Sequence, residues 1–123
     1  MPYLKIQTNQ GMDAGIDTGI EQTLLREASS LVASELGKPE SYVMISIEPP
    51  RPMLFAGTDE PTAYLELKSI GLMESKQPES KTKALSAALC QLISEKMNIP
   101  AERIYIEFAD AQRSMWGWNG STF

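Results

Sequence analysis

Hydrophobic positions in the first half of the chain alternate in two short stretches and recur at helical spacing between them. Residues 3–8 alternate apolar and polar and predict a strand that begins directly after Pro2. Residues 20–36 carry an apolar stripe at helical spacing, and Gly37 is placed to end that helix. Residues 42–48 alternate again and predict a second strand. The inward positions of these elements are Leu4, Ile6, Ile20, Leu24, Ala28, Leu31, Val32, Val43, Ile45 and Ile47.

Turn signals separate these elements. Residues 9–19 form a polar, Gly-rich stretch, and Thr18–Glu21 has the spacing of a capping box that opens the helix. Prolines within residues 49–52 stop the second strand, and residues 53–56 are predicted to form a short edge strand.

The second half of the chain repeats the first. Residues 61–68 predict a strand like residues 2–6, residues 80–97 predict a helix, and residues 100–108 match residues 39–47 almost position for position. Pro61 follows Pro2 at an offset of 59, and the second pair of matching segments has an offset of 61. Self-similarity at half the chain length predicts two duplicated βαβ units, as pseudo-repeats of about residues 1–60 and 61–123 within one domain, 1–123.

The predicted fold class is α+β. Two βαβ units make a four-stranded mixed sheet with both helices on one face, plus short edge strands. The other face of the sheet is expected to carry large apolar residues, which favours an oligomer with sheets packed around a shared axis. The aromatic tail, residues 115–123, is expected to dock as a short strand on the sheet edge of a neighbouring subunit.

Composition narrows the function. A net charge of -5 argues against nucleic acid, and no apolar run approaches the length of a membrane span. No signal peptide opens the sequence, so we expect a cytoplasmic protein, although export without a leader stays open. The chain has no histidine and a single cysteine, Cys90, which leaves acid–base chemistry to an amine, carboxylates or a phenol. No metal site and no cofactor are predicted.

The opening Met1-Pro2 is a candidate for that chemistry. Aminopeptidases remove a methionine that precedes a residue as small as proline, so the mature chain is expected to start at Pro2 with a free secondary amine. An ordinary α-amino group has a pKa of about 7.7–8.0, and burial or a nearby cation lowers it further. Such an amine can accept and return a proton near neutral pH. Proline is also an unremarkable first residue of a strand.

Several further motifs accompany this start, in order along the whole chain: Leu36-Gly-Lys-Pro39, Phe55-Ala-Gly57 with Glu60-Pro61, Ser69-Ile-Gly71, Arg103-Ile-Tyr-Ile106 and Gly117-Trp-Asn-Gly-Ser-Thr-Phe123. As an ordered set they resemble the macrophage migration inhibitory factor and D-dopachrome tautomerase family of the tautomerase superfamily.

The resemblance implies a homotrimer with an active site at each subunit interface and no cofactor. It implies keto–enol tautomerisation of aryl α-keto acids such as phenylpyruvate, with Pro2 as the base that shuttles the proton. It places Lys38 at the substrate carboxylate, Ile70 beside it through a backbone amide, and Tyr105 in the pocket of the adjacent subunit. Further residues expected in the pocket are Tyr3, Tyr42, Glu107, Trp116, Trp118 and Phe123.

Two positions depart from the vertebrate cytokine. Glu107 stands where that protein has asparagine and brings negative charge toward an anionic substrate, and Trp116 replaces a smaller aliphatic residue, which predicts a narrower pocket.

Plainer interpretations of the same residues stay open. Lys38 could complement a helix dipole, Tyr105 could belong to an ordinary half-buried strand, and the tryptophans could anchor a subunit interface. The alternative function is a cytokine-like binding protein with a vestigial tautomerase pocket, for which receptor binding has no support in the residues. Hydration or dehalogenation, with Glu107 activating water, is a third alternative.

Overall fold

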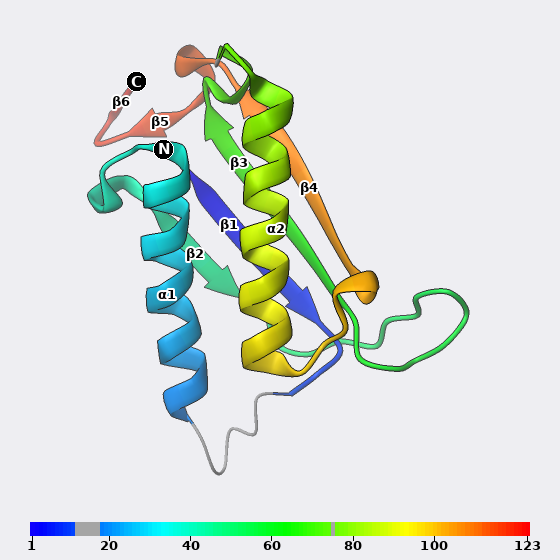
Figure 1. The fold of residues 1–123 in the computed structure, drawn as a ribbon. Helices are drawn as coiled ribbons and strands as arrows, with labels where there is room; N and C mark the ends of the chain where they lie inside the picture. Colours follow the sequence, from blue (N-terminus) through cyan, green and yellow to red (C-terminus); the bar gives the residue numbers. More distant parts are fainter. Residues whose placement is uncertain (12–17, 75) are drawn as a thin grey trace.

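The chain folds into two layers, a four-stranded sheet and two helices that lie side by side on one of its faces (Figure 1). The structure, a computed structural model, describes residues 1–11, 18–74 and 76–123. Helix α1 spans Thr18–Leu36 and helix α2 spans Pro78–Met97. Neither of these helices is apolar enough along its length to cross a membrane.

The sheet has the strand order β2-β1-β3-β4. Strand β1 (Tyr3–Thr8) runs parallel to β2 (Met44–Ile47), and β3 (Ala63–Ile70) runs parallel to β4 (Ile104–Ala111). The two central strands, β1 and β3, are antiparallel. Each half of the chain is therefore a β-α-β unit, and the two units join through β1 and β3. The predicted α+β class, with a mixed sheet and both helices on one face, is confirmed.

The core lies between the sheet and the helices. Alternation along β1 and β3 buries Leu4, Ile6, Leu65 and Leu67 completely, facing the helices. Burying one such side chain stabilises the fold by about 1.5–3 kcal/mol. The helices contribute the matching apolar stripes: Leu24, Ala28, Val32 and Leu36 from α1, and Leu85, Leu89, Leu92 and Ile93 from α2. Several predicted inward positions are less buried: Ile20 is exposed, and Leu31, Val43, Ile45 and Ile47 are half-buried.

Of the two strands predicted around residues 42–56, the first is shorter than expected and the second is absent. Strand β2 begins at Met44 because Glu40–Tyr42 form a 3₁₀ turn, η1, in which the amide of Val43 donates to the carbonyl of Glu40 at 3.0 Å. Residues 53–56 form no strand. Phe55 and Thr58 pair in an isolated bridge across Ala56 and Gly57, whose φ angles of 53° and 77° reverse the chain.

Element ends differ from prediction in smaller ways. Helix α2 begins two residues early, at Pro78, because proline suits the first turn of a helix. Strands β3 and β4 continue to Ile70 and Ala111. Helix α1 begins at Thr18 as expected, but the side chain of Thr18, on which the capping box depends, lies outside the described residues.

A buried arginine pins the loop between β2 and β3. The Arg103 side chain donates from Nε to the carbonyl of Pro61 at 2.8 Å and from Nη1 to that of Phe55 at 3.0 Å. Its Nη2 donates to the carbonyls of Glu60 at 3.0 Å and Thr58 at 3.3 Å. The guanidinium also lies over the Phe55 ring, 5.2 Å from its centre.

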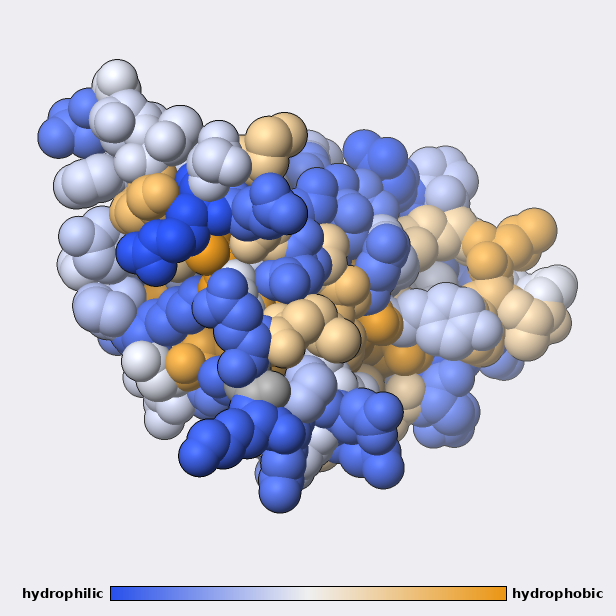
Figure 2. Space-filling model, turned by 90° about the horizontal axis from the view of Figure 1, so that it is seen from above, coloured by the Kyte–Doolittle hydropathy of each residue, from blue (hydrophilic) through white to orange (hydrophobic). Residues whose placement is uncertain are grey.

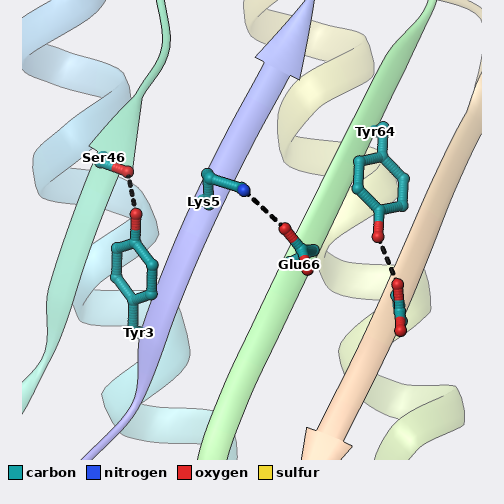
Figure 3. A network of polar contacts seen from close by, with 6 residues as sticks. Tyr3, Lys5, Ser46, Tyr64 and Glu66 are labelled. Carbon is teal, nitrogen blue, oxygen red and sulfur yellow. Dashed lines mark hydrogen bonds and ion pairs between the residues drawn. The ribbon is translucent and has the colours of Figure 1, made fainter.

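The face of the sheet away from the helices is mixed. It carries the expected large apolar residues, among them Met44 and Tyr105, each 65% exposed, but polar pairs also run across it (Figure 3). Tyr3 hydrogen-bonds Ser46 at 2.7 Å, and Lys5 forms an ion pair with Glu66 at 2.7 Å. Strand alternation explains these polar pairs, because the apolar set of each strand is already used against the helices. The third contact on this face joins the Tyr64 hydroxyl to the Glu107 carboxylate.

The tail forms a small hairpin of its own. Strand β5 (Gly117–Trp118) pairs antiparallel with β6 (Ser121–Thr122), and Asn119 and Gly120 make the turn with φ angles of 52° and 78°. Docking of this tail on a neighbouring subunit concerns a second chain and stays a prediction.

Candidate active site at the amino terminus

The start of the chain and the tail hairpin lie at the same end of the molecule (Figure 1). Figure 2 looks down on this end, where hydrophilic side chains cover most of the middle of the view and hydrophobic surface shows between them and at the right-hand edge. Two cavities meet at Met1: a polar one of about 270 Å³ and an aromatic one of about 360 Å³. Tyr42 lines both of them.

Lys38 is held in the polar cavity by the end of helix α1. Gly37 adopts a φ of 63°, its amide donates to Ser34 at 3.2 Å, and the amide of Lys38 donates to Ala33 at 3.0 Å. This Schellman motif turns the chain so that the next residue leaves the helix axis. The polar cavity from now on means the space lined by Met1, Lys38, Pro39, Tyr42, Ile70, Gly71, Glu74 and Arg113.

The far end of the Lys38 side chain is fixed by strand β3. Its ammonium donates to the Ser69 hydroxyl at 2.8 Å and to the Ile70 carbonyl at 2.5 Å. Lys38 and Ile70, two of the predicted site residues, therefore lie together beside the chain start. The ammonium also hydrogen-bonds the Met1 amino group, so its third N–H becomes available to a ligand only once Met1 is removed.

The electrostatics of the polar cavity disfavour positive charge on an amine. Burial lowers the pKa of the Met1 amino group from 8.0 to about 6, and the charges of Lys38 and Arg113 act in the same direction. The pKa of Lys38 is also lowered, chiefly by burial and by Lys81. A terminal amine at this position is thus largely neutral, and basic, at neutral pH.

The aromatic cavity is built by η1 and the tail. The Tyr42 ring meets Trp118 edge-on at 5.5 Å between centres and Phe123 at 5.8 Å, while Trp118 and Phe123 stack at 5.5 Å. The tail is tied back by the amide of Phe123, which donates to the Trp116 carbonyl at 3.2 Å. The structure brings together these predicted pocket residues: Pro2, Tyr3, Tyr42, Trp116, Trp118 and Phe123.

Pro2 itself is buried. In this form of the chain its nitrogen belongs to the Met1–Pro2 peptide bond and has no basic lone pair. Its carbonyl accepts a hydrogen bond from the amide of Met44 at 3.0 Å, which fixes Pro2 to strand β2.

Tyr105 and Glu107 lie away from the Pro2 of their own chain. Tyr105 stands opposite Tyr64, whereas Tyr3 stands opposite Lys68, and four residues along a strand span about 13 Å. Tyr105 packs edge-on against Phe55 with ring centres 4.9 Å apart. The Glu107 carboxylate is engaged by Tyr64. One chain therefore does not gather all the predicted residues at one site.

Sequence reasoning missed two residues of the polar cavity, Glu74 and Arg113. Each lies in a short 3₁₀ turn, η2 (Leu72–Glu74) or η4 (Arg113–Met115). Such isolated charged residues in turns have no periodicity or spacing that would single them out. Within the described ranges, no three His, Cys, Asp or Glu side chains are grouped as a metal site would require.

The family model described as Macrophage migration inhibitory factor (MIF) matches residues 1–123. The chain belongs to this family. A curated macrophage migration inhibitory factor homolog of Brugia malayi is 40% identical over 123 residues, covering 100% of this chain and 99% of that protein. The macrophage migration inhibitory factor of Xenopus tropicalis is 39% identical, with the same coverage.

Solved structures of the macrophage migration inhibitory factor family agree. The homologue from Prochlorococcus marinus superposes with a TM-score of 0.85 at 44% identity, covering 98% of each chain. The protein from Trichinella spiralis superposes with a TM-score of 0.83 at 33% identity, covering 98% of this chain and 99% of that one. The resemblance found in the sequence motifs is thereby confirmed, and with it membership of the tautomerase superfamily.

Proposed function

We propose that the protein, once Met1 is removed, is a cofactor-independent keto–enol tautomerase of aryl α-keto acids such as phenylpyruvate. The observation that carries the proposal is the position of the amino terminus. It lies between a cavity with two cations, Lys38 and Arg113, and a cavity walled by aromatic rings. An aryl α-keto acid has the matching parts, a carboxylate at one end and an aromatic ring at the other.

Pro2 is the proposed base and acid. The neutral amine takes a proton from the carbon next to the ketone of the substrate, and the electron pair of that C–H bond moves to form an enolate. The resulting ammonium then delivers the proton to the enolate oxygen, which gives the enol and regenerates the neutral amine. The reverse sequence converts the enol to the ketone. No electrons enter or leave, so no redox partner is needed.

Lys38 and Ile70 support this transfer at the carboxylate end. The Lys38 ammonium, already oriented by Ser69 and Ile70, supplies fixed positive charge to the carboxylate and to the developing enolate. Its charge also helps to keep the terminal amine neutral. The backbone amide of Ile70 is the proposed second contact to the carboxylate.

Tyr105 is proposed to complete the site from a neighbouring subunit of a homotrimer. The distance along the sheet between Tyr105 and the chain start supports this, because Tyr105 cannot serve the Pro2 of its own chain. Glu107 lies on the same strand and would enter the same neighbouring pocket. Its negative charge is expected to weaken binding of an anionic substrate.

The test is a proline substitution in Met-free protein. Pro2→Ala keeps a removable Met1 but replaces the secondary amine, and turnover of phenylpyruvate should fall by roughly a hundredfold or more. Pro61→Ala is the matched control, because Pro61 occupies the equivalent place before β3 in the second repeat. The proposal fails if Pro2→Ala turns over substrate like the parent while circular dichroism shows both to be folded.

A second test uses the Met1-bearing form, separated and identified by intact mass. Its Pro2 nitrogen is an amide, so it should be inactive. Equal activity in the two forms would rule out the Pro2 amine as the base.

A further inference from the structure

Arg113 faces the candidate site without a counter-ion of its own. It begins η4, one residue after the end of β4, and lines the polar cavity with Lys38. The two ion pairs found among the described parts of the chain are Lys5 with Glu66 and Lys96 with Glu27, so no carboxylate there lies within 4.0 Å of Arg113. Its positive charge acts on both the terminal amine and Lys38.

The charges around the polar cavity are unbalanced. Lys38 and Arg113 contribute two cations, and Glu74 is the one carboxylate lining the cavity. The Glu74 carboxylate lies close to the backbone of Gly71, since a Cβ on Gly71 would meet its Oε2 at 2.9 Å. Asp110 and Glu74 both favour the charged form of Lys38, whereas Lys81 and Arg113 oppose it. With a neutral amine the lining keeps a net positive charge, which an anion would neutralise.

The two cations differ in what they offer to an anion. Lys38 is a point charge with two of its hydrogens already committed to Ser69 and Ile70. Arg113 presents a planar fork of N–H donors whose geometry matches a carboxylate in two parallel hydrogen bonds. An arginine in this position can therefore fix the orientation of a carboxylate as well as attract it.

We propose that Arg113 is a second carboxylate-binding residue of the site, which together with Lys38 clamps the acid group of the substrate. This proposal rests on the tautomerase site described above. It makes the clamp a specificity determinant, because a free acid can engage both cations and an ester or amide of the same shape cannot.

Binding can be measured without turnover. Cinnamate is a planar aryl carboxylate that cannot tautomerise, and cinnamamide is its neutral counterpart. Isothermal titration of Met-free protein should show a strong preference for cinnamate. Arg113→Ala should weaken cinnamate binding by roughly tenfold and leave cinnamamide unaffected. Arg113→Lys should recover part of the loss, and Arg26→Ala, an exposed arginine on α1, is the matched control.

The outcomes separate the two proposals. If Arg113→Ala binds cinnamate as tightly as the parent, or loses both ligands equally, the clamp is overturned. If cinnamate binding depends on Arg113 but the parent turns over no aryl α-keto acid, the clamp stands and the tautomerase function fails.

Turnover gives a further readout where activity is present. With phenylpyruvate, Arg113→Ala should raise KM more than it lowers kcat, whereas with the methyl ester KM should hardly change. An equal rise in KM for acid and ester would contradict the clamp.

Discussion

At the scale of single residues, the site depends on how cations are placed around one amine. Lys38 is fixed at both ends, by the Schellman turn after α1 and by hydrogen bonds to Ser69 and Ile70. Its charge therefore stays near the chain start instead of moving into solvent. A cation held close to an amine lowers the pKa of that amine more than a mobile surface lysine does, because the mobile charge is on average farther away and more screened.

The pH dependence of activity follows from this placement. Cations and burial lower the pKa of a terminal amine, and the neutral form is the base, so activity should persist above that pKa and be lost as pH falls through it. We expect kcat/KM of Met-free protein to fall as the pH is lowered. The midpoint of this fall should lie below about 7.7–8.0, the ordinary pKa range of an α-amino group.

Lys38→Met tests what sets the midpoint of this fall in kcat/KM. Removing the cation should move the midpoint upward, and raised salt should do so to a lesser degree through screening. A midpoint that stays in place in Lys38→Met would show that Lys38 does not set the basicity of the amine, which would leave burial and Arg113 as its causes.

The residues that sequence could predict here are those carried by local motifs. Pro2 and Lys38 each belong to a short recognisable sequence motif. In the structure, Lys38 lines the polar cavity and Pro2 lines the aromatic cavity. Arg113 does not belong to any such motif. Its role depends on where η4 lies relative to the turn at Gly37 and Lys38, which is far earlier in the sequence, and no local sequence pattern predicts that proximity.

At the scale of elements, Arg103 joins the start of β4 to the loop before β3. Its side chain is only 8% exposed and donates to four carbonyls of that loop. Arg103→Met should lower the free energy of unfolding by roughly 2–4 kcal/mol, because the carbonyls would lose charged donors. Urea denaturation measures this, with Arg26→Met as an exposed control expected to change stability by less than about 0.5 kcal/mol. Equal values for the two variants would show that water replaces the guanidinium at no cost.

The polar face of the sheet makes a second prediction at this scale. The hydrogen bond to Glu107 raises the pKa of Tyr64 to about 12, because losing the proton would leave a phenolate beside a carboxylate. Glu107→Gln should return the pKa of Tyr64 toward 10. Labelled-tyrosine NMR across alkaline pH measures the shift, with Glu35→Gln on the opposite, helical side as the control. An unchanged Tyr64 would mean that the contact is absent in solution.

Period-two and helical patterns were enough to predict the sheet, the helices and their duplication, since burial enforces those patterns. These patterns did not predict the places where local backbone conformation determines whether a residue belongs to a strand or a turn. Alternation at Tyr42 reads as strand, but the preceding residues close into η1, and Phe55 lies in a turn set by positive φ at Ala56 and Gly57. On the open face, polar pairs accompany the exposed Met44 and Tyr105, and alternation could not predict these pairs because it assigns only the buried face.

At the scale of the whole molecule, the separation of Tyr105 from Pro2 predicts complementation between subunits. Pro2→Ala and Tyr105→Phe proteins should each be impaired, and co-expression should recover activity in mixed trimers whose sites combine the intact residue of each chain. Mixing two batches of Pro2→Ala is the control. Activity that never exceeds the two parents would mean that Tyr105 has no part in a shared site. Sedimentation should show three chains in the assembly.

The hydrogen bond between the Pro2 carbonyl and Met44, together with the burial of Pro2, has a consequence for biogenesis. The scissile bond that must be cut to free the imino group is adjacent to a residue held inside the finished sheet. Excision is therefore expected to happen while the nascent chain is still emerging from the ribosome. A chain that folds before excision would keep its initiator methionine, and its Pro2 nitrogen would remain an amide.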